Sequence, residues 1–222
     1  MRALALGVLV VMAARLHAQQ DVRSRLGARV PADVAVAVES AAARAAAQGL
    51  PVEPLIQKAL EGAAKGVPAE RVIAAVGVLL TRLAAASGAL REGGVSAPDA
   101  DAIEAGAFAL TAGLSDGEVR DLARASVPPY NPAATLRIAG TLAALGVPSA
   151  QAAELVVANI RAGRSSAELA SLPGSVQGQI ARGATPAQAA AGLTRAAAAA
   201  RPPATPGRPA DRPGRRGPPP RP

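Results

Sequence analysis

The sequence predicts an all-α fold: an irregular array of about eight short capped helices, followed by a disordered C-terminal tail. Three observations lead to this prediction. A phrase of glycine, an aliphatic residue and then a proline or hydroxyl residue recurs along the chain. Apolar residues between the phrases repeat with the period of a helix. No segment alternates between apolar and polar residues for long enough to indicate a sheet.

The recurring phrase is typical of a connection between two helices. Its first copies, GLPVE at 49–53 and GVPAE at 66–70, start seventeen residues apart. Glycine suits the left-handed position just after a helix, and the aliphatic residue can pack as a staple on the next helix. Further copies begin at Gly94, Gly113, Gly146, Gly163 and Gly183, and a copy without glycine lies at 29–34.

Several phrases also contain the residues that cap helix starts. Capping boxes are predicted by spacing at Ser115 with Glu118, at Ser165 with Glu168 and at Thr185 with Gln188. Asn131, followed by a proline, predicts another helix start. The intervals between phrases vary, and the aromatic signature of tetratricopeptide repeats is missing. The array is therefore expected to be repeat-like without a strict period.

The segments between the phrases have amphipathic helical patterns. Apolar residues in 52–63, 72–83 and 152–160 recur three and four positions apart, as on one face of a helix. Alanine is abundant and aromatic residues are almost absent. This composition favours close approach between helices over a thick core.

The first eighteen residues are predicted to be a secretory signal peptide, cleaved after Ala18. Arg2 gives a positive start, and residues 3–14 form an unbroken apolar run. Such a run spans about 18 Å, short of the roughly 30 Å hydrocarbon core, which argues against the alternative of a retained anchor. We therefore expect export to the periplasm or beyond, with no transmembrane span after cleavage. Residues 19–200 form the predicted helical domain, which has no cysteine for disulfides.

The positive charge of the chain is concentrated in the tail, residues 201–222. The whole chain has a net charge of +8, whereas residues 19–200 have 16 basic and 15 acidic groups, or +1. The tail has six arginines and one acid, or +5. With one Tyr, one Phe and no Trp to stack on bases, nucleic-acid binding is not expected.

The tail itself is rich in proline and arginine, which predicts a disordered segment with polyproline II character. Its arginines are candidate contacts for anionic lipid or for acidic polymers of the envelope. The candidate residues are Arg208, Arg212, Arg215 and Arg216. The alternative is a solubilising end whose composition reflects a GC-rich genome.

The composition excludes the most familiar catalytic arrangements. The only histidine, His17, lies in the predicted signal peptide, and there is no cysteine. Ser-His-Asp and Cys-His sites are therefore excluded from the mature chain. Paired carboxylates, Ser-Lys pairs and carboxylate metal sites remain. Lys58 and Lys65 lie three and four residues from Glu61, a spacing typical of an exposed helix face. A lysine held as a catalytic base is the alternative.

Two further segments contain candidate site residues. Asp99, Asp101 and Glu104 lack the spacing of an EF-hand loop and suit a helix N-terminus instead, so no metal or other cofactor is predicted. Tyr130 lies in a proline-rich loop, VPPYNP at 127–132. An exposed tyrosine of this kind can be a contact for a partner, whereas more often the ring fills a gap between helices.

The segment 49–78 resembles stretches of uncharacterised exported, alanine-rich helical proteins of GC-rich bacteria. The resemblance implies no activity. It rests on Lys58, Ala59, Leu60, Glu61, Gly62, Lys65, Gly66, Val67, Pro68 and Arg71. The sequence therefore predicts an exported bacterial scaffold or protein-interaction module that is not an enzyme, with another envelope protein or an anionic envelope polymer as its partner. The alternatives are an anionic-surface binder acting through the tail and an enzyme that uses carboxylates alone.

Overall fold

The computed structural model describes residues 22–200, and these residues form helices and connections without any strand. The prediction of an all-α fold is confirmed. After a helical turn at 22–26, the elements are η1 (Gly27–Arg29), α2 (Ala32–Ala47), α3 (Glu53–Ala64), α4 (Ala69–Glu92), α5 (Ala100–Thr111), α6 (Asp116–Ala125), α7 (Pro132–Ala144), α8 (Ser149–Arg161), α9 (Ser166–Ala170), α10 (Leu172–Ala181) and α11 (Pro186–Ala199). The expected number of about eight helices was too low, since ten α-helices follow η1 in this part of the chain.

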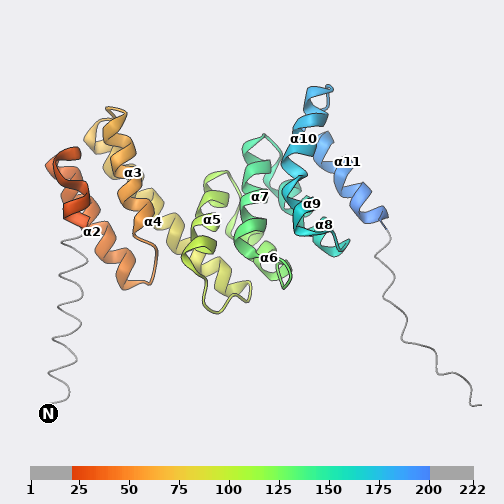
Figure 1. Ribbon diagram of the computed structural model, residues 1–222, viewed down its shortest axis with the longest axis horizontal. Coiled ribbons are helices and arrows are strands. Elements are labelled where there is room, and N and C mark those ends of the chain that lie inside the picture. Colours follow the sequence, from red (N-terminus) through yellow and green to blue (C-terminus); the bar gives the residue numbers. More distant parts are fainter. Residues whose placement is uncertain (1–21, 201–222) are drawn as a thin grey trace, which may run out of the picture.

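The helices stand side by side in a curved row, with α2 and α3 at one end and α10 and α11 at the other (Figure 1). They pack in two layers. In one layer α2, α4, α6, α8 and α11 contact each other in that order, and in the other α5 contacts α7, which contacts α10. Helix α3 packs on α2 and α4. Most helices therefore pack against the neighbour in the chain and the next helix but one.

The predicted connections adopt the expected backbone. All seven glycines of the recurring phrase have positive φ, for example 65° at Gly66. The turn at Gly66 shows the hydrogen bonds of a Schellman motif: Gly66 N donates to Ala63 O at 3.0 Å, and Val67 N donates to Gly62 O at 2.9 Å. The same two bonds recur at the other six glycines. These glycines end their helices as the sequence indicates.

Each connection also prepares the start of the next helix. The three predicted capping boxes are present, and Asn131 accepts hydrogen bonds from Ala133 N and Ala134 N. Pro68 and Pro148 occupy the N-cap position itself, one residue before the helix. Because glycine and cap are separated by one residue, five connections have the same four-residue length. They join α3 to α4, α5 to α6, α7 to α8, α8 to α9 and α10 to α11.

One helix boundary lacked a glycine signal and was missed. Helix α9 is only five residues long, and it ends at Ala170, with Ser171 alone between it and α10. Pro173 lies in the first turn of α10. A proline has no amide hydrogen to donate to an earlier carbonyl, so it is tolerated in the first turn of a helix and not in the interior. The proline thus accounts for the division of this segment into two helices.

The core consists of leucine, valine and alanine side chains between closely spaced helices. The predicted apolar faces are confirmed, since Leu55, Val76 and Leu155 are at most 1 % exposed. Glycine permits the closest contacts. A Cβ at Gly106 of α5 would lie 2.8 Å from the Cβ of Ala86 in α4. The composition therefore allows the close approach that we expected.

Helix α4 is the longest helix, with 24 residues, and it spans most of the first half of the array. It packs against α2, α3, α5 and α6. Among residues 22–200 it alone is long and apolar enough to cross a membrane, a test that core helices of soluble proteins also pass. Only 39 % of the most apolar 18-residue stretch of α4 is buried. The middle of α4 is thus apolar and partly open.

Candidate functional site

A groove opens where the second layer of helices is interrupted. Helices α3 and α5 both pack on α4, yet they are not one of the pairs that pack extensively within residues 22–200. Figure 1 shows α4 running obliquely from behind α3 to beneath α5. By contrast, α5 and α7 pack more extensively than any other pair in the described part of the chain. The gap between α3 and α5 therefore exposes the middle of α4.

The groove has a largely apolar floor, and its walls combine apolar side chains with charged and hydroxyl side chains. Its volume is about 480 Å³. The floor comes from α4, one wall from the first turns of α3 and the other from the last turns of α5. The lining residues are Pro54, Lys58, Ala75, Val78, Leu79, Arg82, Leu83, Glu104, Ala107, Phe108 and Thr111. Val78 is 50 % exposed and Phe108 is 42 % exposed. Two of the five exposed large hydrophobic side chains of residues 22–200 thus lie in this groove.

Phe108 occupies the edge of the groove nearest to α7. Its ring packs over Gly140 of α7, where an added Cβ would lie 2.7 Å from Phe108 Cε1. One part of the ring is thus fixed against a neighbouring helix, while the rest faces solvent. A ring held in one orientation loses little conformational entropy when a partner covers it, which is a common property of interface aromatics.

Arg82 is the cation on the floor of the groove. Its Nη1 donates a hydrogen bond to Thr111 Oγ1 at 3.0 Å, which holds the guanidinium toward α5. No carboxylate in the described part of the chain lies within ion-pair distance of Arg82. A guanidinium has five donors, so Arg82 retains capacity for a carboxylate from outside.

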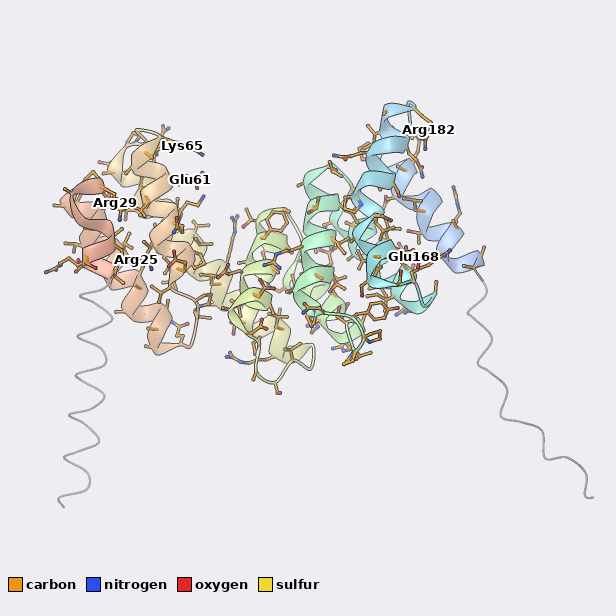
Figure 2. All side chains as sticks on the ribbon, viewed as in Figure 1. Arg25, Arg29, Glu61, Lys65, Glu168 and Arg182 are labelled. Atoms are coloured by element: carbon orange, nitrogen blue, oxygen red, sulfur yellow. The ribbon has the colours of Figure 1, made fainter. Side chains whose placement is uncertain are left out.

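Lys58 lies on the opposite wall and belongs to a three-residue cluster. Lys58 Nζ lies 2.9 Å from one oxygen of Glu61, and Lys65 Nζ lies 2.5 Å from the other. Figure 2 shows Glu61 and Lys65 together near one end of α3. The hydrogen bond from Lys65, followed by that from Lys58, lowers the pKa of Glu61 to about 2. The carboxylate of Glu61 thus pairs with two ammonium groups, and the three side chains together have a net charge of +1.

Glu104 is the acid of the α5 wall. Burial, and secondly the negative charge of Asp101, raise the pKa of Glu104 above its ordinary value. Asp101 itself pairs with Arg137 of α7, Nη2 to Oδ1 at 2.5 Å, which lowers the pKa of Asp101. Glu104 is therefore the half-buried acid in a groove whose other charged groups are cations.

A second hollow, of about 590 Å³, lies between α6 and α8 and contains three acids, Glu118, Asp121 and Glu154. Two of them already have structural partners. Glu118 accepts from Ser115 N at 2.7 Å and from Ser149 Oγ at 3.2 Å, and Asp121 pairs with Arg124 at 3.1 Å. Although this hollow is larger, its acids stabilise a helix start and a helix surface. Neither exposed valines nor aromatic rings line it.

Tyr130, the predicted contact residue, joins two connections. Its hydroxyl donates to Arg164 O at 2.8 Å, and Ile160 O lies 3.4 Å away. The ring is half-buried beside the core. This is the gap-filling arrangement that a tyrosine in such a loop more often adopts, and a role in partner contact stays a prediction. The other predicted contacts, Arg208, Arg212, Arg215 and Arg216, lie outside the described residues, as do the predicted signal peptide and tail.

The remaining candidate residues have structural roles in this part of the chain. Asp99 caps α5 by accepting from Ala102 N at 2.8 Å. Within residues 22–200, no three histidine, cysteine, aspartate or glutamate side chains come together as metal ligands would. Sequence reasoning missed Val78, Arg82 and Phe108 as a site, because only the packing of α5 on α4 brings Phe108 beside the other two.

Comparison with protein-family models, with curated proteins and with solved structures finds no match for this chain. The function is therefore argued from the groove and from the charges of the chain.

Proposed function

We propose that the protein is an exported helical scaffold that binds a segment of another envelope protein in the groove between α3 and α5. The observation behind this proposal is the groove itself, with the exposed Val78 and Phe108 beside Arg82. Exposed apolar side chains that gather within a polar rim are typical of protein-binding surfaces. Export follows from the predicted signal peptide, and the partner is then a protein of the same compartment.

We further infer that the array is repeat-like, built from helix-turn-helix units. Five connections of equal length and the contacts between next-but-one helices support this inference. Arrays of this kind present extended surfaces and bind other proteins through them. The interruption between α3 and α5 gives this particular array one site that differs from the rest of its surface.

Site-specific crosslinking tests the proposal. A photo-reactive residue at position 78 of the full chain, produced in the bacterium that encodes it, should give a discrete adduct with one envelope protein. The matched control is position 36, because Val36 is another exposed valine, 64 % exposed on α2. The proposal fails if position 78 gives no adduct, or if both positions give the same adducts.

A second candidate function is binding to anionic envelope surfaces through the C-terminal part of the chain. Residues 169–222 contain eight arginines and a single acid, Asp211, whereas residues 22–168 have 14 basic and 14 acidic groups. Two of these arginines are exposed in the described part of the chain: Arg182 directly after α10 (Figure 2) and Arg195 in α11. This asymmetry favours attraction to polyanions at the C-terminal end alone.

An enzyme that uses only carboxylates is the competing class. The acids of the α6–α8 hollow are its best candidates, and the partners of Glu118 and Asp121 argue for structural roles instead. Glycan-cleaving sites of this type need one acid and one base that flank a bound sugar. The binding module is therefore the preferred proposal.

A further inference from the structure

We infer that the occupant of the α3–α5 groove is an amphipathic helix with an apolar face and an acidic side chain placed to meet Arg82. This inference rests on the proposed function and specifies the chemistry of the partner segment. The groove separates two helices that both pack on α4, since α3 lines one side of it, α5 lines the other and α4 lies beneath. Figure 1 shows α3 and α5 apart from each other, with α4 passing between them.

The floor of the groove favours a helix over an extended peptide. Ala75, Val78 and Leu79 provide apolar surface without free donors or acceptors, and the amides and carbonyls of α4 are already bonded within that helix. An extended segment gains affinity through main-chain hydrogen bonds to a strand edge, and residues 22–200 contain no strand. A helix satisfies its own backbone and contributes only side chains. The partner side chains would then pack on Val78 and Phe108, both of which are exposed.

The charges of the groove select the acidic side chain. Arg82 lacks a carboxylate partner among the described residues, and Lys58 shares the carboxylate of Glu61 with Lys65. An aspartate or glutamate above Arg82 would therefore gain an ion pair without breaking an existing one. Arg82 and Lys58 repel the arginine-rich segment 201–222, and only Glu104 attracts it, so this tail is a poor occupant of the groove.

A peptide selection tests the inference. The probe is a displayed library of helix-forming peptides of about 16 residues, or roughly 24 Å of helix, randomised on one face. It is selected on the full chain and then on the Arg82→Glu variant. Selection on the natural chain should enrich Asp or Glu at one position, with apolar residues three and four positions away. Selection on Arg82→Glu should enrich Lys or Arg at that same position.

Binding of the enriched peptides then separates the outcomes. Val78→Asp should weaken binding about tenfold or more, because it places a charge on the apolar floor. Val36→Asp on α2 is the matched control and should leave binding unchanged. Arg82→Gln should weaken a Glu-bearing peptide roughly two- to fivefold and leave its Gln-bearing version unchanged. Circular dichroism of each variant should match that of the natural chain, because Val78 and Val36 are exposed.

Two results would overturn the inference in different ways. Some selected peptides could bind the groove without apolar residues at helical spacing, or without an acidic position that becomes basic in the Arg82→Glu selection. Such peptides would contradict the helical partner and leave the proposed binding function standing. Peptides whose binding ignores Val78→Asp would show that the groove is not the binding surface. That second result would contradict both proposals.

Discussion

The ring of Phe108 lies against Gly140, so closely that a methyl group at position 140 would approach Phe108 Cε1 to 2.7 Å. This contact joins α5 to α7 and fixes the edge of the groove. Because Gly140 has a hydrogen atom in place of a side chain, α5 and α7 can approach each other closely. These two helices are the most extensively packed pair in the described array.

Gly140→Ala should therefore destabilise the protein by about 1–3 kcal/mol, because the ring and α5 must shift to accommodate the methyl group. The matched control is Gly77→Ala in α4, where an added Cβ meets nothing within 4 Å. That variant should be stabilised by up to about 1 kcal/mol, since alanine is the better helix former. Urea unfolding of the three proteins measures both changes, and equal effects of the two substitutions would contradict the packing.

Gly66→Ala should destabilise the protein by about 1 kcal/mol through the backbone alone. Gly66 has a φ of 65°, and an added Cβ would meet nothing within 4 Å, so only the left-handed conformation opposes the change. Gly66→Asn should recover part of the loss, because asparagine tolerates this conformation better than alanine. Indifference of the unfolding free energy to Gly66→Ala would contradict the role of the connection.

Ser126 and Thr135 form a buried pair of hydroxyls, with 2.6 Å between their oxygens, beside the connection of α6 to α7. Ser126 Oγ also lies 2.7 Å from Leu122 O, and Thr135 Oγ1 lies 3.0 Å from Pro132 O. Thr135→Val should cost about 1–3 kcal/mol, because it removes a partner from a buried hydroxyl. Adding Ser126→Ala should cost less than the sum of the two single changes. Strict additivity of the unfolding free energies would contradict the coupling.

The pKa of Glu61 should be about 2 in an NMR titration, below its ordinary value of 4.5. Since the folded pKa is the lower one, the cluster's contribution to stability is fully present above about pH 4.5 and is lost as the pH falls toward 2. Lys65→Gln should raise the pKa more than Lys58→Gln. Because the groups are exposed, about 1 M salt should also raise it. A pKa that ignores both lysines would contradict the cluster.

Deletion of residues 201–222 should leave the melting temperature unchanged and abolish binding to vesicles that contain an anionic phospholipid. The prediction follows from the five net positive charges of the tail. Binding of the full chain should fall steeply between low and physiological salt, where the Debye length is about 8 Å. Neutral phosphatidylcholine vesicles are the control. Full binding by the shortened chain would contradict a role for the tail.

The sequence predicted the connections better than the site. Gly66 and the other phrase glycines specify their conformation locally, since the residue type, the following aliphatic residue and the cap lie within four positions. The boundary at Ser171 has no such local glycine and was missed. The groove depends on how far apart α3 and α5 pack on α4, which no short segment specifies. Val78 and Phe108 therefore could not be recognised as site residues from the sequence.

The two-layer packing has a consequence for how the chain folds. Because each helix contacts mainly helices one or two places away in the chain, most native contacts join residues that are close in sequence. Chains with such low contact order fold quickly, in microseconds to milliseconds for helical domains, because little loop entropy is lost before contacts form. A newly synthesised chain of this design would complete each helical hairpin soon after it emerged, without waiting for its C-terminal end.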